Sequence, residues 1–388
     1  MKIGAATAGV RLGEILLQEG NKSTHHTQSI EFEYSKISRF LSEESKPSLM
    51  PEFLLDLSSK SMKTINGGIF EAREVSTVEM SLEEEIVERP TLNLNDSQVP
   101  DEPKPLIKSE NTSPVIGIDV SSVRVGESEA GTIYSLRGAI VWREQQDYNY
   151  MRCGPLTFYL NDSISRFLNG RSQTSNNMLY AAWSPLNERV LARLRNTLER
   201  WMQRYASSKL SKGIVLIDGS LTAGTPDNPI VYLTELLRES RENQNSVIGF
   251  SKDTRLCYSG KKITRLLDKS TAPSIINIDR MIAPQFPSSP IKLMGRVYIA
   301  KLASGGLPFR VDIDRELSEE TAIEAMGQLI NSDLVEQGYP ETLRLAHILS
   351  TFTANEILAI QRHLTIEHGL RLTPKMNLRR SLFGPYGT

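Results

Sequence analysis

The stretch Pro114-Val-Ile-Gly-Ile-Asp-Val-Ser-Ser122 is an apolar run that carries one carboxylate, Asp119, and then turns polar. Apolar runs of this kind, bounded by Pro and Ser, are typical of a strand that is buried on both faces. An acid at the end of such a strand is either misplaced or functional. We interpret Asp119 as a functional residue.

A second stretch about a hundred residues later has the same pattern of an apolar run that carries an aspartate. Gly213-Ile-Val-Leu-Ile-Asp-Gly-Ser220 is an apolar run that ends in Asp218. If the two strands lie in one sheet, their carboxylates meet at one edge of it. Paired carboxylates at such an edge predict a site for divalent metal ions.

The composition narrows the class of protein. Lys plus Arg (45) and Asp plus Glu (46) nearly cancel over 388 residues, so net charge neither indicates nor excludes a nucleic-acid partner. The 2 cysteines exclude a disulfide framework and suit a reducing cytoplasm, where we expect the protein to be located. No apolar run approaches the roughly 18 to 20 residues of a membrane helix, so we expect no membrane partner.

The chain divides near residue 112. Residues 1–112 have scattered polar residues and short apolar pieces, which predicts a partly helical arm, with a short helix at Ile30–Leu41 and acidic linker sequence that includes Asn93–Thr112. Such an arm either wraps the main domain or a partner, or is irregular. Residues 113–388 form the predicted main domain, with a basic tail at Arg371–Arg380.

The pattern of the main domain predicts an α/β fold. After the first strand, alternation and glycines over Ser121–Glu144 predict two antiparallel strands, and a polar loop is expected up to Ser184. The elements expected next are a helix at Pro185–Tyr205, the strand that carries Asp218, a helix at Ile230–Glu239 and a strand at Ser246–Phe250. Three strands, helix, strand, helix, strand is the order of the ribonuclease-H-like fold, a mixed sheet flanked by helices.

That order places a third carboxylate on the helix before the Asp218 strand. Standard rises along a strand and an antiparallel helix bring Glu199 level with Asp218. Glu188 shares its helical face but lies roughly 16 Å further along the axis. We prefer Glu199 and keep Glu188 as the alternative; either residue could instead be an ordinary solvated glutamate beside arginines.

Two further residues have both a functional and an ordinary interpretation. His347 lies on a largely apolar helix that begins near Tyr339, so it is either a core histidine or a late metal or acid/base ligand. Lys252 follows the strand Ser246–Phe250 and is either a surface lysine or a phosphate contact.

Taken in order, five motifs resemble the NurA family of DNA repair nucleases. The motifs are Gly117-Ile-Asp-Val-Ser-Ser122, Val215-Leu-Ile-Asp-Gly-Ser-Leu221, Ile248-Gly-Phe-Ser-Lys252, Pro308-Phe-Arg-Val-Asp312 and Tyr339-Pro-Glu-Thr-Leu-Arg-Leu-Ala-His347. The resemblance covers roughly residues 114 to 365. Val120-Ser121 departs from the Gly-Ser that the family often has, and the resemblance does not extend to residues 1–112.

The resemblance implies a manganese-dependent 5′ to 3′ exonuclease with single-strand endonuclease activity, acting in DNA end resection and double-strand break repair. It also implies a homodimer and a hexameric HerA-type translocase as partner. By matching position, Asp119 and Asp218 are metal carboxylates, Lys252 lies beside the site and His347 faces it.

Such a site would hydrolyse phosphodiesters with two Mn²⁺ or Mg²⁺ ions. We expect Asp119 to bridge the ions, Asp218 and Glu199 each to complete one, and His347 to ligate or to move a proton, while Lys252 stabilises the phosphate. The substrate would be single- and double-stranded DNA, bound without sequence preference through arginines and lysines. Two other classes remain open: an actin-like ATPase or sugar kinase, since Gly117-Ile-Asp119 also opens that fold, and a catalytically silent scaffold.

Overall fold

The computed structural model describes residues 52–65, 67–73, 92–94, 99–144, 146–161, 186–225, 228–282 and 291–374. The helix expected at Ile30–Leu41 lies outside these residues, as does the tail beyond Pro374. No helix in the described ranges is both long and apolar enough to cross a membrane.

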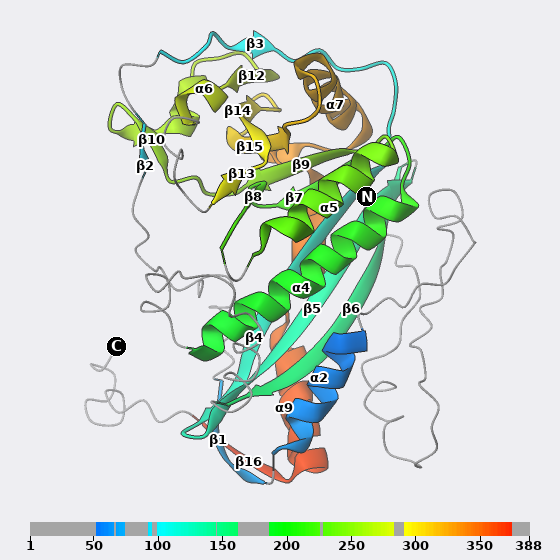
Figure 1. Ribbon diagram of the computed structural model, residues 1–388, viewed down its shortest axis with the longest axis vertical. Helices are drawn as coiled ribbons and strands as arrows, with labels where there is room; N and C mark the ends of the chain where they lie inside the picture. Colours follow the sequence, from blue (N-terminus) through cyan, green and yellow to red (C-terminus); the bar gives the residue numbers. More distant parts are fainter. Residues whose placement is uncertain are drawn as a thin grey trace.

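Five strands and two helices form the centre of the protein (Figure 1). The strands are β4 (Val115–Ser128), β5 (Gly131–Glu144), β6 (Asp147–Leu160), β7 (Ile214–Asp218) and β9 (Ser246–Ser251), and the helices are α4 (Leu186–Lys209) and α5 (Ile230–Glu242). The spatial order is β6-β5-β4-β7-β9, in which β4, β7 and β9 are parallel and β5 is antiparallel to both of its neighbours. This is the ribonuclease-H-like arrangement, so the predicted fold class is confirmed.

The third strand differs from the sequence prediction. The expected pair of strands within Ser121–Glu144 is instead the second half of a long β4 and the whole of β5, and β6 occupies a segment that was expected to be loop. Gly154-Pro155 inside β6 is a turn signal in the sequence. Tertiary pairing with β5 and packing of α2 (Glu52–Lys63) on β6 override that local signal, for example where the Ser58 hydroxyl donates to the Thr157 carbonyl.

The sheet continues on both sides of the core. Beyond β9 follow β15 (Phe309–Asp314), β14 (Gly295–Lys301), β12 (Ser274–Asn277) and β3 (Lys104–Pro105), and beside the far end of β4 lie β1 (Gly68–Ala72) and β16 (Leu370–Pro374). In the described part of the chain this sheet has 11 strands. The described pieces before residue 113 therefore take part in the main sheet through β1 and β3.

Four further α-helices follow in the described residues: α6 (Asp279–Ile282), α7 (Glu319–Ser332), α8 (Glu341–Ser350) and α9 (Ala354–His368). Of these, α8 is the helix that the sequence predicts to begin near Tyr339. The other described strands are short: β2 (Leu92–Asn93), β8 (Thr222–Ala223), β10 (Leu256–Tyr258), β11 (Lys261–Lys262) and β13 (Lys292–Leu293).

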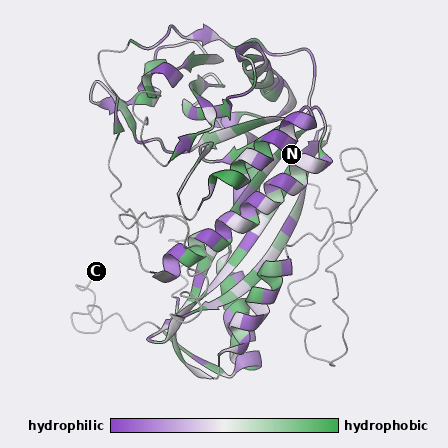
Figure 2. Ribbon diagram, viewed as in Figure 1, coloured by the Kyte–Doolittle hydropathy of each residue, from purple (hydrophilic) through white to green (hydrophobic). Residues whose placement is uncertain are grey.

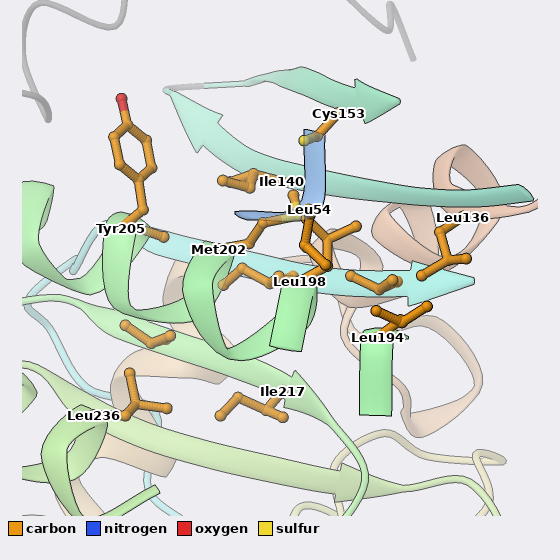
Figure 3. Packing of buried hydrophobic residues seen from close by; sticks show 14 of the residues in the cluster. Leu54, Leu136, Ile140, Cys153, Leu194, Leu198, Met202, Tyr205, Ile217 and Leu236 are labelled. Carbon is orange, nitrogen blue, oxygen red and sulfur yellow. The ribbon is translucent and has the colours of Figure 1, made fainter. Parts of the chain in front are cut away.

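Helix α4 packs on the sheet through one apolar face. Figure 2 shows hydrophobic and hydrophilic residues alternating along this helix. In Figure 3, Leu194, Leu198 and Met202 point from α4 towards the sheet, where β5 carries Leu136 and Ile140, and all five belong to one buried cluster. Burial of such side chains contributes roughly 1.5–3 kcal/mol each. This packing fixes the height of α4 against the sheet.

Helix α8 lies against the other face of β4. Ile116 and Ile118 of β4 belong to the α4 cluster, and because side chains alternate along a strand, Gly117 and Asp119 face the opposite way. A Cβ atom on Gly117 would come within 2.9 Å of the Thr342 carbonyl oxygen of α8. Glycine at this position therefore allows α8 to approach the strand that carries Asp119.

Candidate metal centre

The parallel register of β4 and β7 brings Asp119 and Asp218 together. Ile118 is paired with Ile217 at the end of this ladder, so the next residue of each strand is an aspartate. Strand β7 ends at Asp218 while β4 continues, and the next strand on that side, β1, pairs with β4 only at Gly126 and Glu127. The two carboxylates therefore lie where the sheet opens.

Helix α8 adds His347 to this pair. Its Nδ1 lies 3.0 Å from Asp119 Oδ2 and 3.9 Å from Asp218 Oδ2. One ligand atom from each of the three residues lies within 4.8 Å of the others. About half of the His347 side chain is exposed, whereas Asp119 is buried. The buried side of the cluster is therefore formed by β4, and the imidazole of His347 lies on its solvent-exposed side.

Lys252 and Tyr339 contact Asp218. Lys252 Nζ lies 2.6 Å from Asp218 Oδ2, and the Tyr339 hydroxyl lies 3.4 Å from Asp218 Oδ1. The Tyr339 ring packs edge-on against Phe250 and Phe309, which holds its hydroxyl in place. The structure thus brings the sequence-predicted Lys252 to the site. Tyr339 begins a motif in the sequence, but no role for it was deduced from the sequence.

Ser350 is a second residue that the sequence analysis missed. Its hydroxyl donates to Asp119 Oδ2 at 2.6 Å. The available signal was its position three residues after His347, since residues three apart share a helical face.

The two candidate glutamates lie in different surroundings. The charges of Asp119 and Asp218 both raise the pKa of Glu199, so this residue lies within electrostatic reach of the aspartates. Glu188 is exposed and lies near Tyr134 on the far half of β5, where burial and then the charge of Glu188 raise the pKa of Tyr134. Glu199 is outside the compact three-residue cluster, and its Oε1 accepts a hydrogen bond from Gln203 Nε2 at 2.7 Å.

The carboxyl groups of the site have different proton affinities. Burial works to raise the pKa of Asp119, but hydrogen bonds from His347 and Ser350 lower it below its usual value. Burial raises the pKa of Asp218, partly offset by Lys252. Burial, together with both aspartates, raises the pKa of Glu199 to about 7. A low-dielectric site with three acids in proximity favours a bound cation.

The donor set fits a hard or borderline divalent ion. Two carboxylates and one imidazole offer oxygen and nitrogen ligands, as Mg²⁺ and Mn²⁺ accept, and lack the thiolates that select softer metals. Asp119, Asp218 and His347 would hold such an ion. The second ion expected from the sequence would need Glu199 as well.

Comparisons with known proteins find one matching family and several similar solved structures. A family model described as the NurA domain matches residues 114–350. The NurA nuclease from Sulfolobus solfataricus is a similar solved structure, with 16% identity, a TM-score of 0.44 and coverage of 66% of this chain and 85% of that one. A second structure described as NurA has 12% identity, a TM-score of 0.37 and coverage of 63% and 85%.

Endonuclease V from Bacillus subtilis is also similar, with 12% identity, a TM-score of 0.34 and coverage of 63% of this chain and 82% of that one. A comparison with curated proteins finds no match. The family match covers more than half of the chain and includes Asp119, Asp218 and His347. This chain belongs to the NurA family.

Proposed function

We propose that this protein is a metal-dependent deoxyribonuclease that hydrolyses phosphodiester bonds at the Asp119–Asp218–His347 cluster. The observation that carries the proposal is the convergence of these three side chains, distant in sequence, within 4.8 Å. We further propose Mn²⁺ or Mg²⁺, as two ions, as the cofactor. Divalent ions bound there would lower the pKa of a water molecule and neutralise phosphate charge.

Each residue of the site has its own role in the proposed reaction. Asp119 and Asp218 hold the cofactor, and Glu199 completes its ligand set from α4. Lys252 is close enough to Asp218 to place a positive charge beside a bound phosphate, where it would stabilise the negative charge of the transition state. His347 is half exposed and lies at the open side of the cluster, where it ligates the cofactor or moves a proton.

The substrate we propose is DNA, both single- and double-stranded, cut from the 5′ end and also internally in single strands. Family membership supports this substrate, and it supports end resection in double-strand break repair as the process. On the same basis we propose a homodimer and a hexameric HerA-type translocase as the partner. A light-scattering measurement of the molar mass tests the dimer, and co-purification with a translocase tests the partner.

The deciding experiment uses DNA labelled at either end. Single- and double-stranded substrates are incubated with the protein and Mn²⁺, Mg²⁺ or a chelator, and the products are resolved by length. We expect cleavage only with a metal, and mononucleotides released from the 5′ end. Asp119→Ala should abolish cleavage but leave the circular dichroism spectrum unchanged.

A matched control is Asp56→Ala, which removes an exposed carboxylate that pairs with Lys60 on α2. This variant should cleave as the wild type does. Metal-dependent cleavage that persists in Asp119→Ala would overturn the assignment of the site. ATP hydrolysis without DNA cleavage would indicate the actin-like class, and neither activity would indicate a scaffold.

A further inference from the structure

Ser350 is the last residue of α8, and its side chain is completely buried. Its hydroxyl donates to Asp119 Oδ2 at 2.6 Å, the same oxygen that His347 Nδ1 approaches at 3.0 Å. Both of these side-chain contacts end on Oδ2. The two contacts restrict rotation of the Asp119 carboxylate. Asp119 Oδ1 takes part in neither contact.

The single proton of the hydroxyl has two acceptors within reach. Besides Asp119 Oδ2, the Ser350 Oγ lies 3.0 Å from the His347 carbonyl oxygen. The shorter contact is with an ionised carboxylate, and hydrogen bonds to charged acceptors are the stronger ones. The His347 carbonyl also accepts a hydrogen bond from the Thr351 hydroxyl, at 2.8 Å. Ser350 is therefore not needed to satisfy the end of α8.

Neighbouring contacts fix Ser350 from both sides. The Ser121 hydroxyl donates to the Ser350 carbonyl at 2.5 Å. Ser121 lies two residues after Asp119, on the same face of β4. The strand that presents the carboxylate therefore also holds the residue that orients it.

The segment after Ser350 is fixed by a buried ion pair. Arg137 of β5 is 1% exposed; it pairs with Glu356 at 2.9 Å and donates to the Thr351 carbonyl at 3.4 Å. Glu356 in turn accepts from the Thr353 amide in the capping box of α9. The turn between α8 and α9 is thus tied to the sheet immediately beyond Ser350.

We propose that Ser350 is a positioning residue that orients Asp119 for metal binding, and that Ser121 holds Ser350 in place for this task. The inference rests on the proposed function, because it concerns the same site. Outer hydrogen bonds to metal ligands typically change metal affinity by about 10- to 100-fold. Ser350→Ala should therefore raise the dissociation constant for Mn²⁺ by about 10-fold or more.

The test measures Mn²⁺ binding to the full chain by calorimetry, and cleavage as a function of Mn²⁺ concentration. In Ser350→Ala we expect weaker binding and cleavage that recovers as Mn²⁺ is raised. The matched control is Thr351→Ala, which removes a neighbouring hydroxyl that bonds to the same carbonyl but does not reach Asp119. Its Mn²⁺ affinity should equal that of the wild type.

A second pair of variants separates positioning from general destabilisation. In an Asp119→Asn background, Ser350→Ala should cause no further loss of Mn²⁺ affinity, because its effect passes through Asp119. Ser121→Ala should weaken Mn²⁺ binding in the same direction by a smaller factor, and it serves as the test if Ser350→Ala does not fold.

The outcomes distinguish this inference from the proposed function. If the wild type binds Mn²⁺ and cuts DNA while Ser350→Ala or its substitute Ser121→Ala binds Mn²⁺ equally well, only the inference is overturned. An equal loss of affinity in Thr351→Ala would also overturn it. If the wild type binds Mn²⁺ but cuts no DNA, the proposed function fails while the role of Ser350 is still measured by binding. A wild type that binds neither Mn²⁺ nor Mg²⁺ overturns both.

Discussion

Lys252 Nζ lies 2.6 Å from Asp218 Oδ2, the oxygen that also faces His347 Nδ1. An ammonium group in this position shares an oxygen with the proposed metal site. The lysine therefore has two opposite effects. Its positive charge weakens the binding of a metal ion to Asp218, and the same charge stabilises a phosphate bound nearby.

Lys252→Met should separate these two effects. Loss of the ammonium charge should tighten Mn²⁺ binding by about tenfold. The ammonium group and the bound Mn²⁺ carry like charges, and near a protein surface such charges a few ångströms apart repel each other by at most several kcal/mol. Cleavage at saturating Mn²⁺ should nevertheless fall by about 100-fold, since a positive charge beside the phosphate is lost. Calorimetry and single-turnover cleavage measure the two quantities. Lys60→Met, on the exposed side of α2, is the control. Equal cleavage by Lys252→Met and wild type would exclude a role for Lys252 in the reaction.

Replacing the two candidate glutamates should show which one serves the site. Glu199→Gln should lower the cleavage rate by about 100-fold or more, because a ligand lost from a metal site reduces both affinity and charge stabilisation. Glu188→Gln, on the same helix but exposed and near Tyr134, should cleave as the wild type does. Initial rates at fixed Mn²⁺ test both variants. The reverse ranking would assign the third carboxylate to Glu188.

The stability of the metal-free protein should fall as the pH rises towards 7. Burial, with the charges of Asp119 and Asp218, raises the pKa of Glu199 from 4.5 to about 7. Between these values the folded state keeps a proton that the unfolded state has lost, so folding is favoured at the acid end of the window. The loss should amount to about 1–2 kcal/mol, because Glu199 is only half buried.

Urea unfolding in a chelator at pH 5, 6 and 7 tests this expectation. Other groups also titrate in this range, so the informative quantity is the difference between the wild type and Glu199→Gln. That variant should be the more stable protein at pH 7, with a difference that shrinks towards pH 5. A constant difference across the window would show that Glu199 does not titrate there.

The buried Arg137–Glu356 pair should contribute to stability at neutral pH. Burial works to raise the pKa of Glu356, but hydrogen bonds from Arg137 and the Thr353 amide lower it to about 2. A lowered folded pKa stabilises the protein above the unfolded value of about 4.5, and this contribution is lost as the pH falls towards 2. At pH 7, Glu356→Gln should therefore reduce the free energy of unfolding by about 3 kcal/mol.

Glu242→Gln is the exposed counterpart for this measurement, since Glu242 pairs with Arg238 one turn away on α5. Its effect should stay below about 1 kcal/mol. Urea titrations at pH 7 and pH 3 give both values. If Glu356→Gln were as mild as Glu242→Gln at pH 7, the buried pair would not stabilise the turn that follows Ser350.

Local patterns in the sequence were sufficient for many of the elements. The apolar runs that contain Asp119 and Asp218 are strands β4 and β7, and helical periodicity located α4. The role of Glu199 on α4 stays a prediction. Strand β6 was missed because its segment was interpreted as part of a polar loop up to Ser184. Pairing with β5 decides its structure, and no local pattern reports such a partner.

The sequence by itself determined strands β4, β7 and β9 and helices α4 and α5, because apolar periodicity is a local property of the chain. It also determined that two buried-type strands end in aspartate. Only the tertiary structure decided that Asp119 and Asp218 stand side by side, through the parallel register of β4 and β7. It alone brought His347 and Ser350 to the same carboxylate oxygen across 228 and 231 residues. Those contacts depend on the approach of α8 to Gly117, which arises from packing between distant segments.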